Sequence, residues 1–109
     1  MDNTEERIKQ HLIDLAKESK ITSYKSLVYD LNLSIGYNSK ELEDVLTKIS
    51  EKTYADDKIL LSALVVNRTA HIPGHGFFKF QKQSDDKTIF WAQETIKVIE
   101  HYRYNRNFQ

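Results

Sequence analysis

Three stretches in the first half of the chain carry apolar side chains at the spacing of a buried helical face. The first covers about residues 4–19, with its apolar stripe at Ile8, Leu12, Leu15 and Ala16. After a short extended piece at residues 21–22, Ser23 caps a second, short helix whose core positions are Leu27, Val28 and Leu31. A turn at residues 34–38 leads to a third helix, capped by Ser39, with the cleanest periodicity in the chain at Leu42, Val45, Leu46 and Ile49.

The second half of the chain predicts two strands and one more helix. Residues 59–66 are continuously apolar and rich in β-branched side chains, which is typical of a strand covered on both faces. Residues 67–76 predict a loop, and residues 77–82 predict a strand with one solvent-exposed face. The strands at residues 59–66 and 77–82 would then form a β-hairpin. The last helix is expected at about residues 88–104, with a main stripe at Ile89, Ala92, Ile96 and Ile99 that is widened by Trp91, Val98 and Tyr102.

The order of these elements is that of a winged helix-turn-helix. The predicted fold class is α+β: three helices plus a β-hairpin wing, with an appended C-terminal helix. A chain of 109 residues has room for one hydrophobic core and little room for a second. We therefore expect one winged-helix-like domain over residues 1–109.

The charge of the chain cancels overall but is unevenly distributed. Lys and Arg together number 16, and so do Asp and Glu. Residues 1–57 hold twelve acidic and eight basic side chains, whereas residues 58–84 hold four basic side chains and no acidic one. The zero total argues mildly against nucleic-acid binding, and the acid-free middle segment predicts a local positive patch.

The composition excludes several kinds of site. The chain has no Cys, so disulfide bonds, thiolate catalysis and Cys-ligated zinc are ruled out. The first ten residues are acidic and polar, unlike a secretory signal, and the longest apolar run is too short to cross a bilayer. We expect a cytoplasmic protein with no membrane partner.

Three motifs resemble the pattern of a small bacterial winged-helix family. They are Ser62-Ala63-Leu64-Val65-Val66, then Pro73-Gly74-His75-Gly76-Phe77-Phe78, and finally Phe90-Trp91. Residues 21–27 are also similar to the start of the helix-turn-helix in many bacterial winged helices. The resemblance covers about residues 20–100 and implies the fold without assigning an activity. A looser likeness to the DNA-binding half of DNA alkyltransferase-like proteins lacks their Pro-Cys-His-Arg signature, and without Cys there is no alkyl acceptor.

The start of the third helix is the first candidate nucleic-acid-binding surface. Asn38, Ser39 and Lys40 lie where a recognition helix contacts base edges and phosphates. Three acidic residues follow at once and would face phosphates with like charge: Glu41, Glu43 and Asp44. The alternative is a solvated helix face whose acidic residues lie near the positive end of the helix dipole.

The expected wing is the second candidate surface. Its candidate contacts are the basic side chains and histidines of the acid-free segment: Arg68, His71, His75, Lys79 and Lys82. An arginine binds phosphate in a bidentate manner, and the backbone N–H groups of Gly74 and Gly76 would let a phosphate approach closely. The alternative is a loop in which Pro and Gly only shape the turn.

Metal binding and catalysis are only weakly indicated. His71 and His75 are candidate metal ligands, with Asp85 or Asp86 as a third, but no third ligand has diagnostic spacing. Ser62 lies within an apolar run and not on a nucleophile elbow. We therefore expect no metal, no cofactor and no enzymatic activity.

Two functional hypotheses remain open. The first is a winged-helix nucleic-acid-binding protein, with duplex DNA favoured, that contacts backbone phosphates through the wing and the start of the third helix. The second is a bacterial or phage protein-interaction or inhibitor module in genome defence or its evasion, which the acidic third helix and the zero net charge favour. In either case the C-terminal helix is a candidate homodimer interface.

Overall fold

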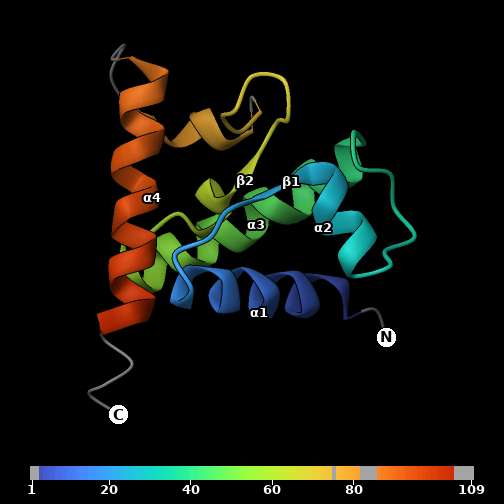
Figure 1. Ribbon diagram of the computed structural model, residues 1–109, viewed down its shortest axis with the longest axis horizontal. Coiled ribbons are helices and arrows are strands. Elements are labelled where there is room, and N and C mark those ends of the chain that lie inside the picture. Colours follow the sequence, from blue (N-terminus) through green and yellow to red (C-terminus); the bar gives the residue numbers. More distant parts are fainter. Residues whose placement is uncertain (1–2, 75, 82–85, 105–109) are drawn as a thin grey trace.

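Helices carry most of the fold, and a minimal sheet joins two distant parts of the chain (Figure 1). The computed structural model describes residues 3–74, 76–81 and 86–104. In chain order, its elements are α1 (Thr4–Lys17), β1 (Thr22–Ser23), α2 (Tyr24–Asp30), α3 (Lys40–Asp57), the 3₁₀ turn η1 (Leu61–Leu64), β2 (Val65–Val66), the 3₁₀ turn η2 (Phe77–Phe80) and α4 (Lys87–Tyr104). The fold class is therefore α+β, as predicted.

The three N-terminal helices form as their periodicity predicts. α1 buries Ile8, Leu12 and Ala16, and α3 buries Leu42, Leu46 and Ile49 among others. Both predicted serine caps are confirmed: the Ser23 hydroxyl accepts a hydrogen bond from the backbone N–H of Ser26, and the Ser39 hydroxyl accepts one from Leu42. These helices and η1 enclose the main core.

The predicted β-hairpin over residues 59–82 is wrong for the residues that the structure describes. Only Val65 and Val66 of the first run form a strand, and they pair in parallel with Thr22 and Ser23 of β1. A hairpin would have paired antiparallel strands adjacent in the chain. β1 and β2 lie side by side at the centre of the molecule in Figure 1.

Two side chains of α3 explain why residues 59–62 are not a strand. The Ser50 hydroxyl accepts a hydrogen bond from the backbone N–H of Ser62 at 2.9 Å and donates one to the Ser62 hydroxyl at 2.6 Å. The Thr53 hydroxyl donates to the carbonyl of Ile59 at 2.9 Å. These buried hydroxyls replace the partner strand that the backbone would otherwise need.

The second predicted strand is a 3₁₀ turn because its aromatic side chains gather on one side. Phe77 is buried and packs edge-on against Phe78, with ring centroids 5.2 Å apart, and also against Phe90 of α4 at 5.5 Å. Leu60 and Ala63 complete this second cluster. The clustering of adjacent aromatic residues is incompatible with the alternation of a strand. Lys82, the predicted end of that strand, lies outside the described residues.

The buried face of α4 differs from the predicted stripe. Ile89 and Ile96 are 57% and 56% exposed, whereas Val98 is buried together with Glu94 and Thr95. The indole N–H of Trp91 donates to the carbonyl of Ala63 at 2.7 Å, which fixes the rotation of the helix. α4 packs against α1 and η1, and Figure 1 shows it crossing the C-terminal end of α1.

Candidate functional site

Residues 67–72 form a loop that is closed by its own hydrogen bonds. The Asn67 side-chain oxygen accepts hydrogen bonds from the backbone N–H groups of Thr69 at 2.8 Å and Ala70 at 3.1 Å. The Asn67 backbone N–H donates to the carbonyl of Ile72, and the His71 N–H donates to the carbonyl of Asn67. This network presents Arg68 on an ordered, exposed turn directly after β2.

Tyr24, the first residue of α2, holds the far end of this loop. Its hydroxyl accepts a hydrogen bond from the backbone N–H of Gly74 at 2.7 Å. Burial raises the pKa of the Tyr24 phenol, the Gly74 N–H lowers it, and the Glu43 carboxylate raises it again. Tyr24 is therefore a neutral anchor at physiological pH, and the Gly74 N–H is not free to bind a phosphate.

A pocket of about 450 Å³ lies between three segments of the chain. The start of α2 contributes Tyr24 and Lys25, and the loop after β2 contributes Asn67, Arg68, Thr69 and Gly74. The turn before α3 and the first turns of that helix contribute Tyr37, Asn38, Ser39 and Glu43. A volume of this size falls within the range of small-molecule sites, about 300–1,000 Å³.

The pocket lining carries two cations, Lys25 and Arg68, and the aromatic ring of Tyr37. The Lys25 Nζ atom lies 5.9 Å from the centroid of the Tyr37 ring, which is a cation–π distance. Neither Lys25 nor Arg68 forms an ion pair with another described residue. Glu43 is the carboxylate of the lining, so the pocket offers both positive and negative groups to a ligand.

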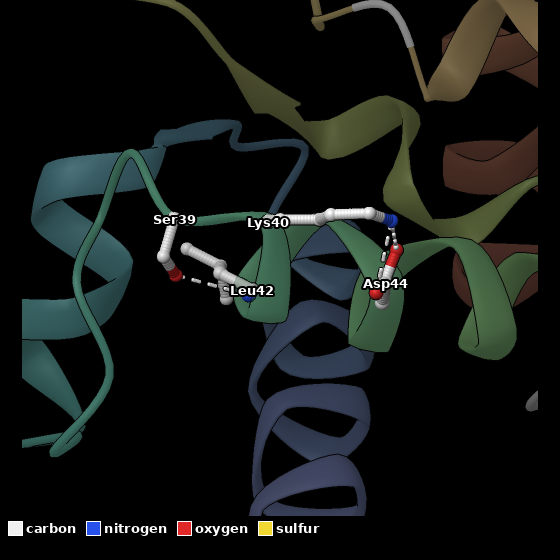
Figure 2. A network of polar contacts seen from close by, with 4 residues as sticks. All are labelled: Ser39, Lys40, Leu42 and Asp44. Atoms are coloured by element: carbon white, nitrogen blue, oxygen red, sulfur yellow. Dashed lines mark hydrogen bonds and ion pairs between the residues drawn. The ribbon is translucent and has the colours of Figure 1, made fainter.

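Two of the predicted contacts at the start of α3 already have partners within the protein (Figure 2). The Ser39 hydroxyl caps the helix by accepting from the backbone N–H of Leu42. It also donates to the carbonyl of Gly36 at 2.7 Å. The Lys40 Nζ lies 3.0 Å from Asp44 Oδ1, an exposed ion pair on the helix surface. The Ser39 hydroxyl thus holds the turn before α3 at the edge of the pocket, and the carboxylate of Asp44 balances the charge of Lys40.

The structure unites part of the predicted site. Asn38, Ser39 and Arg68 line the same pocket, although they belong to segments far apart in the sequence. His71 and Lys79 are exposed but do not line it. His75 and Lys82 lie outside the described residues, so their predicted roles stay predictions.

Sequence reasoning missed six of the lining residues: Tyr24, Lys25, Tyr37, Glu43, Asn67 and Thr69. The nearest signal was the position of Tyr24 directly after the Ser23 cap, at the start of a short helix. That signal becomes informative only once the loop after β2 is known to fold back over α2.

The described part of the chain contains neither a cluster of metal ligands nor a membrane-spanning helix. No group of three or more His, Asp or Glu side chains in that part is arranged to hold a metal ion. No described helix combines the length and low polarity needed to span a bilayer. The pairing of His71 with His75 is untested, since His75 is not described.

Comparisons of the chain with models of protein families, with curated proteins and with solved structures give no match. The resemblance to a bacterial winged-helix family therefore stays a prediction.

Proposed function

We propose that this protein is a non-catalytic, cytoplasmic nucleic-acid-binding module that contacts backbone phosphates through Lys25 and Arg68. The observation that carries the proposal is the pair of cations on the lining of one pocket, neither of them in an ion pair with a described residue. Unpaired cations beside a concave surface attract phosphates, and an arginine binds them in a bidentate manner.

The arrangement of the helices supports a winged-helix relationship. The chain passes through α1, β1, α2 and α3 in the order typical of that fold, and the loop after β2 lies beside the start of α3. In this proposal residues 67–74 take the place of the wing, although they form no hairpin. Asn38 at the pocket edge is then a polar contact to the ligand.

A binding assay across a salt series tests this proposal. Fluorescence anisotropy with labelled single-stranded and duplex oligonucleotides should show affinity falling as salt rises, with a logarithmic slope of about −0.7 per phosphate for single strands. Arg68→Ala should weaken binding about ten- to a hundredfold, because it removes a charged hydrogen bond. Lys25→Ala should reduce the magnitude of the logarithmic salt slope by about 0.7 for single strands, which is the contribution of one phosphate contact.

Lys79→Ala is the matched control for the charge change. Lys79 is exposed, forms no ion pair with a described residue and does not line the pocket. Its removal should change affinity far less than the removal of Arg68. Absence of binding at low salt, or equal losses for the two variants, would refute the proposal.

The exposed face of α4 favours a second candidate function, protein interaction. Ile89 and Ile96 lie on the same side of the helix and are both more than half exposed. Large apolar side chains aligned on one helix face are typical of an interface. This candidate is a bacterial or phage interaction or inhibitor module, with a homodimer through α4 as its simplest form.

Light scattering over a protein concentration series tests the homodimer. The wild-type chain should show a mass that rises toward twice that of the monomer, and Ile96→Glu should remain monomeric because it places a charge in the apolar contact. A monomeric wild-type chain at high concentration would exclude the homodimer.

A further inference from the structure

The pocket between α2, α3 and the loop after β2 combines three kinds of chemistry. Arg68 and Lys25 supply positive charge, Tyr37 supplies an aromatic ring, and Asn67 and Glu43 supply hydrogen-bonding groups. A site for a bare phosphate needs only the first kind. The presence of all three indicates a ligand that is anionic at one end, flat in another part and rich in N–H and O–H donors.

Tyr37 is the aromatic surface on which such a ligand would stack. Its side chain is 47% exposed although it is large and apolar, and it stands at the pocket lining beside Lys25. A base stacked on this ring would lie next to the Lys25 ammonium, whose Nζ is 5.9 Å from the ring centroid.

Glu43 and Asn67 fit the polar edge of a nucleotide. The Asn67 side-chain oxygen is used by the loop, which leaves its NH₂ group to donate to a ligand. The Glu43 carboxylate can only accept hydrogen bonds when ionised, as from the amino group of a base or a ribose hydroxyl. A carboxylate would repel a second phosphate, so the site suits one nucleotide unit and not a run of phosphates.

The acidic start of α3 argues against docking of this helix in a duplex groove. Glu41 and Asp44 lie on its first turns, and the charge of Lys40 is balanced by Asp44. A helix with this charge pattern would meet the phosphates on both sides of a major groove with repulsion. A pocket of about 450 Å³ admits a small ligand and not a base pair held in a duplex.

We propose that the pocket binds one unpaired nucleotide of a nucleic-acid strand, with its phosphate at Arg68 and Lys25 and its base on Tyr37. This inference rests on the proposed nucleic-acid-binding function and narrows it from nucleic acid in general to single-stranded or locally unpaired segments. It departs from the expectation, drawn from the sequence, that duplex DNA is the favoured ligand.

Competition between matched oligonucleotides tests the inference. A labelled single-stranded octanucleotide should bind at least tenfold more tightly than a blunt hairpin that contains the same sequence in paired form. Tyr37→Ala should weaken binding of the single strand about tenfold, which is the loss of one base–aromatic stack. Tyr37→Phe should retain wild-type affinity, because stacking needs the ring and not the hydroxyl.

Nuclear magnetic resonance with free ligands identifies which part of the strand enters the pocket. A 5′-mononucleotide should shift the backbone signals of Tyr37, Asn67 and Arg68, whereas inorganic phosphate or a nucleoside alone should shift them less at equal concentration. Signals from η2, which include Lys79, should not move and serve as the internal control.

The two proposals fail in different ways. If single strands and the blunt hairpin bind equally and Tyr37→Ala changes nothing, while Arg68→Ala still weakens binding, the protein binds nucleic acid but the unpaired-nucleotide site is wrong. If neither form binds at low salt, both proposals are wrong. If phosphate shifts the pocket signals as strongly as the mononucleotide does, the base is not recognised and the inference falls.

Discussion

At the scale of single residues, Gly74 and Gly76 are required for space and not for an unusual backbone. Neither has a positive φ, and Gly76 has the helical values φ −58° and ψ −37°, which any residue adopts. A Cβ atom on Gly76 would lie 2.8 Å from Glu43 Cγ, and one on Gly74 would lie 3.3 Å from the Tyr24 hydroxyl oxygen. The glycines thus let the chain lie directly against two side chains of the pocket.

Gly76→Ala should destabilise the protein by about 1 kcal/mol, the low end of the usual cost of overpacking, because the atoms that must move belong to the flexible Glu43 side chain. In the double variant Gly76→Ala, Glu43→Ala, most of that loss should disappear, because the clashing atoms are gone. Urea denaturation of the single and double variants measures the coupling. An equal loss with and without Glu43 would show that the contact with this side chain is not the reason for the glycine. Gly74→Ala should cost less, since 3.3 Å requires only a small shift.

At the scale of elements, the Ser50–Ser62 contact decides that η1 replaces a strand. Ser50→Ala should lower the free energy of unfolding by about 1–3 kcal/mol, because the buried Ser62 N–H and hydroxyl both lose their partner. Ser62→Ala is the matched control: it removes one hydroxyl but keeps the N–H bonded to Ser50, so its loss should be smaller. Chemical denaturation compares the two variants. A Ser62→Ala loss as large as that of Ser50→Ala would contradict this account.

The same contact explains why the sequence predicts some elements and not others. The helices α1, α2 and α3 follow from periodicity, and α2 and α3 also from serine caps, all of which are local signals within one segment. The structure of residues 59–66 depends on two hydroxyls of α3 that lie twelve positions (Ser50 to Ser62) and six positions (Thr53 to Ile59) away. The rotation of α4 depends likewise on the bond from Trp91 to the carbonyl of Ala63. Long-range polar contacts of this kind leave no periodic trace.

The residues of the candidate site divide in the same way, into those that local sequence signals predict and those that depend on long-range contacts. Asn38 and Arg68 could be selected from the chemistry of a helix start and an acid-free loop. Tyr24, Lys25 and Tyr37 could not, because nothing in their neighbourhood along the chain indicates that the loop after β2 closes over them. A parallel pairing between β1 and β2 brings these segments together, and the sequence had predicted a hairpin instead.

At the scale of the whole molecule, α4 joins the main core to the aromatic cluster. Val98 and Tyr102 pack on the main core, whereas Phe90 and Trp91 belong to the second cluster. Tyr102 is half-buried, and burial, and secondarily the charge of Asp57 at the end of α3, raises the pKa of its phenol to about 12. We therefore expect ionisation of this side chain to weaken the packing of the C-terminal helix.

Stability should fall as pH rises from about 10 to about 12. The pKa of a tyrosine in the unfolded chain is about 10, so the unfolded state loses the Tyr102 proton first and is favoured above that pH. Burial also raises the pKa of Tyr24, which adds to the loss in the same direction. Because Tyr102 is partly exposed and solvent screens its charge, we expect its ionisation to account for about 1 kcal/mol of the lost stability.

Urea denaturation at pH 9 and pH 11.5 measures this loss. Tyr102→Phe cannot ionise, so the variant should lose less stability than the wild-type chain between these two pH values, while Tyr24 still contributes its part. Tyr29→Phe is the matched control, because the Tyr29 side chain is 84% exposed and its hydroxyl is hydrated in both states. If Tyr102→Phe and Tyr29→Phe follow the same pH profile, the packing of α4 does not depend on a neutral Tyr102.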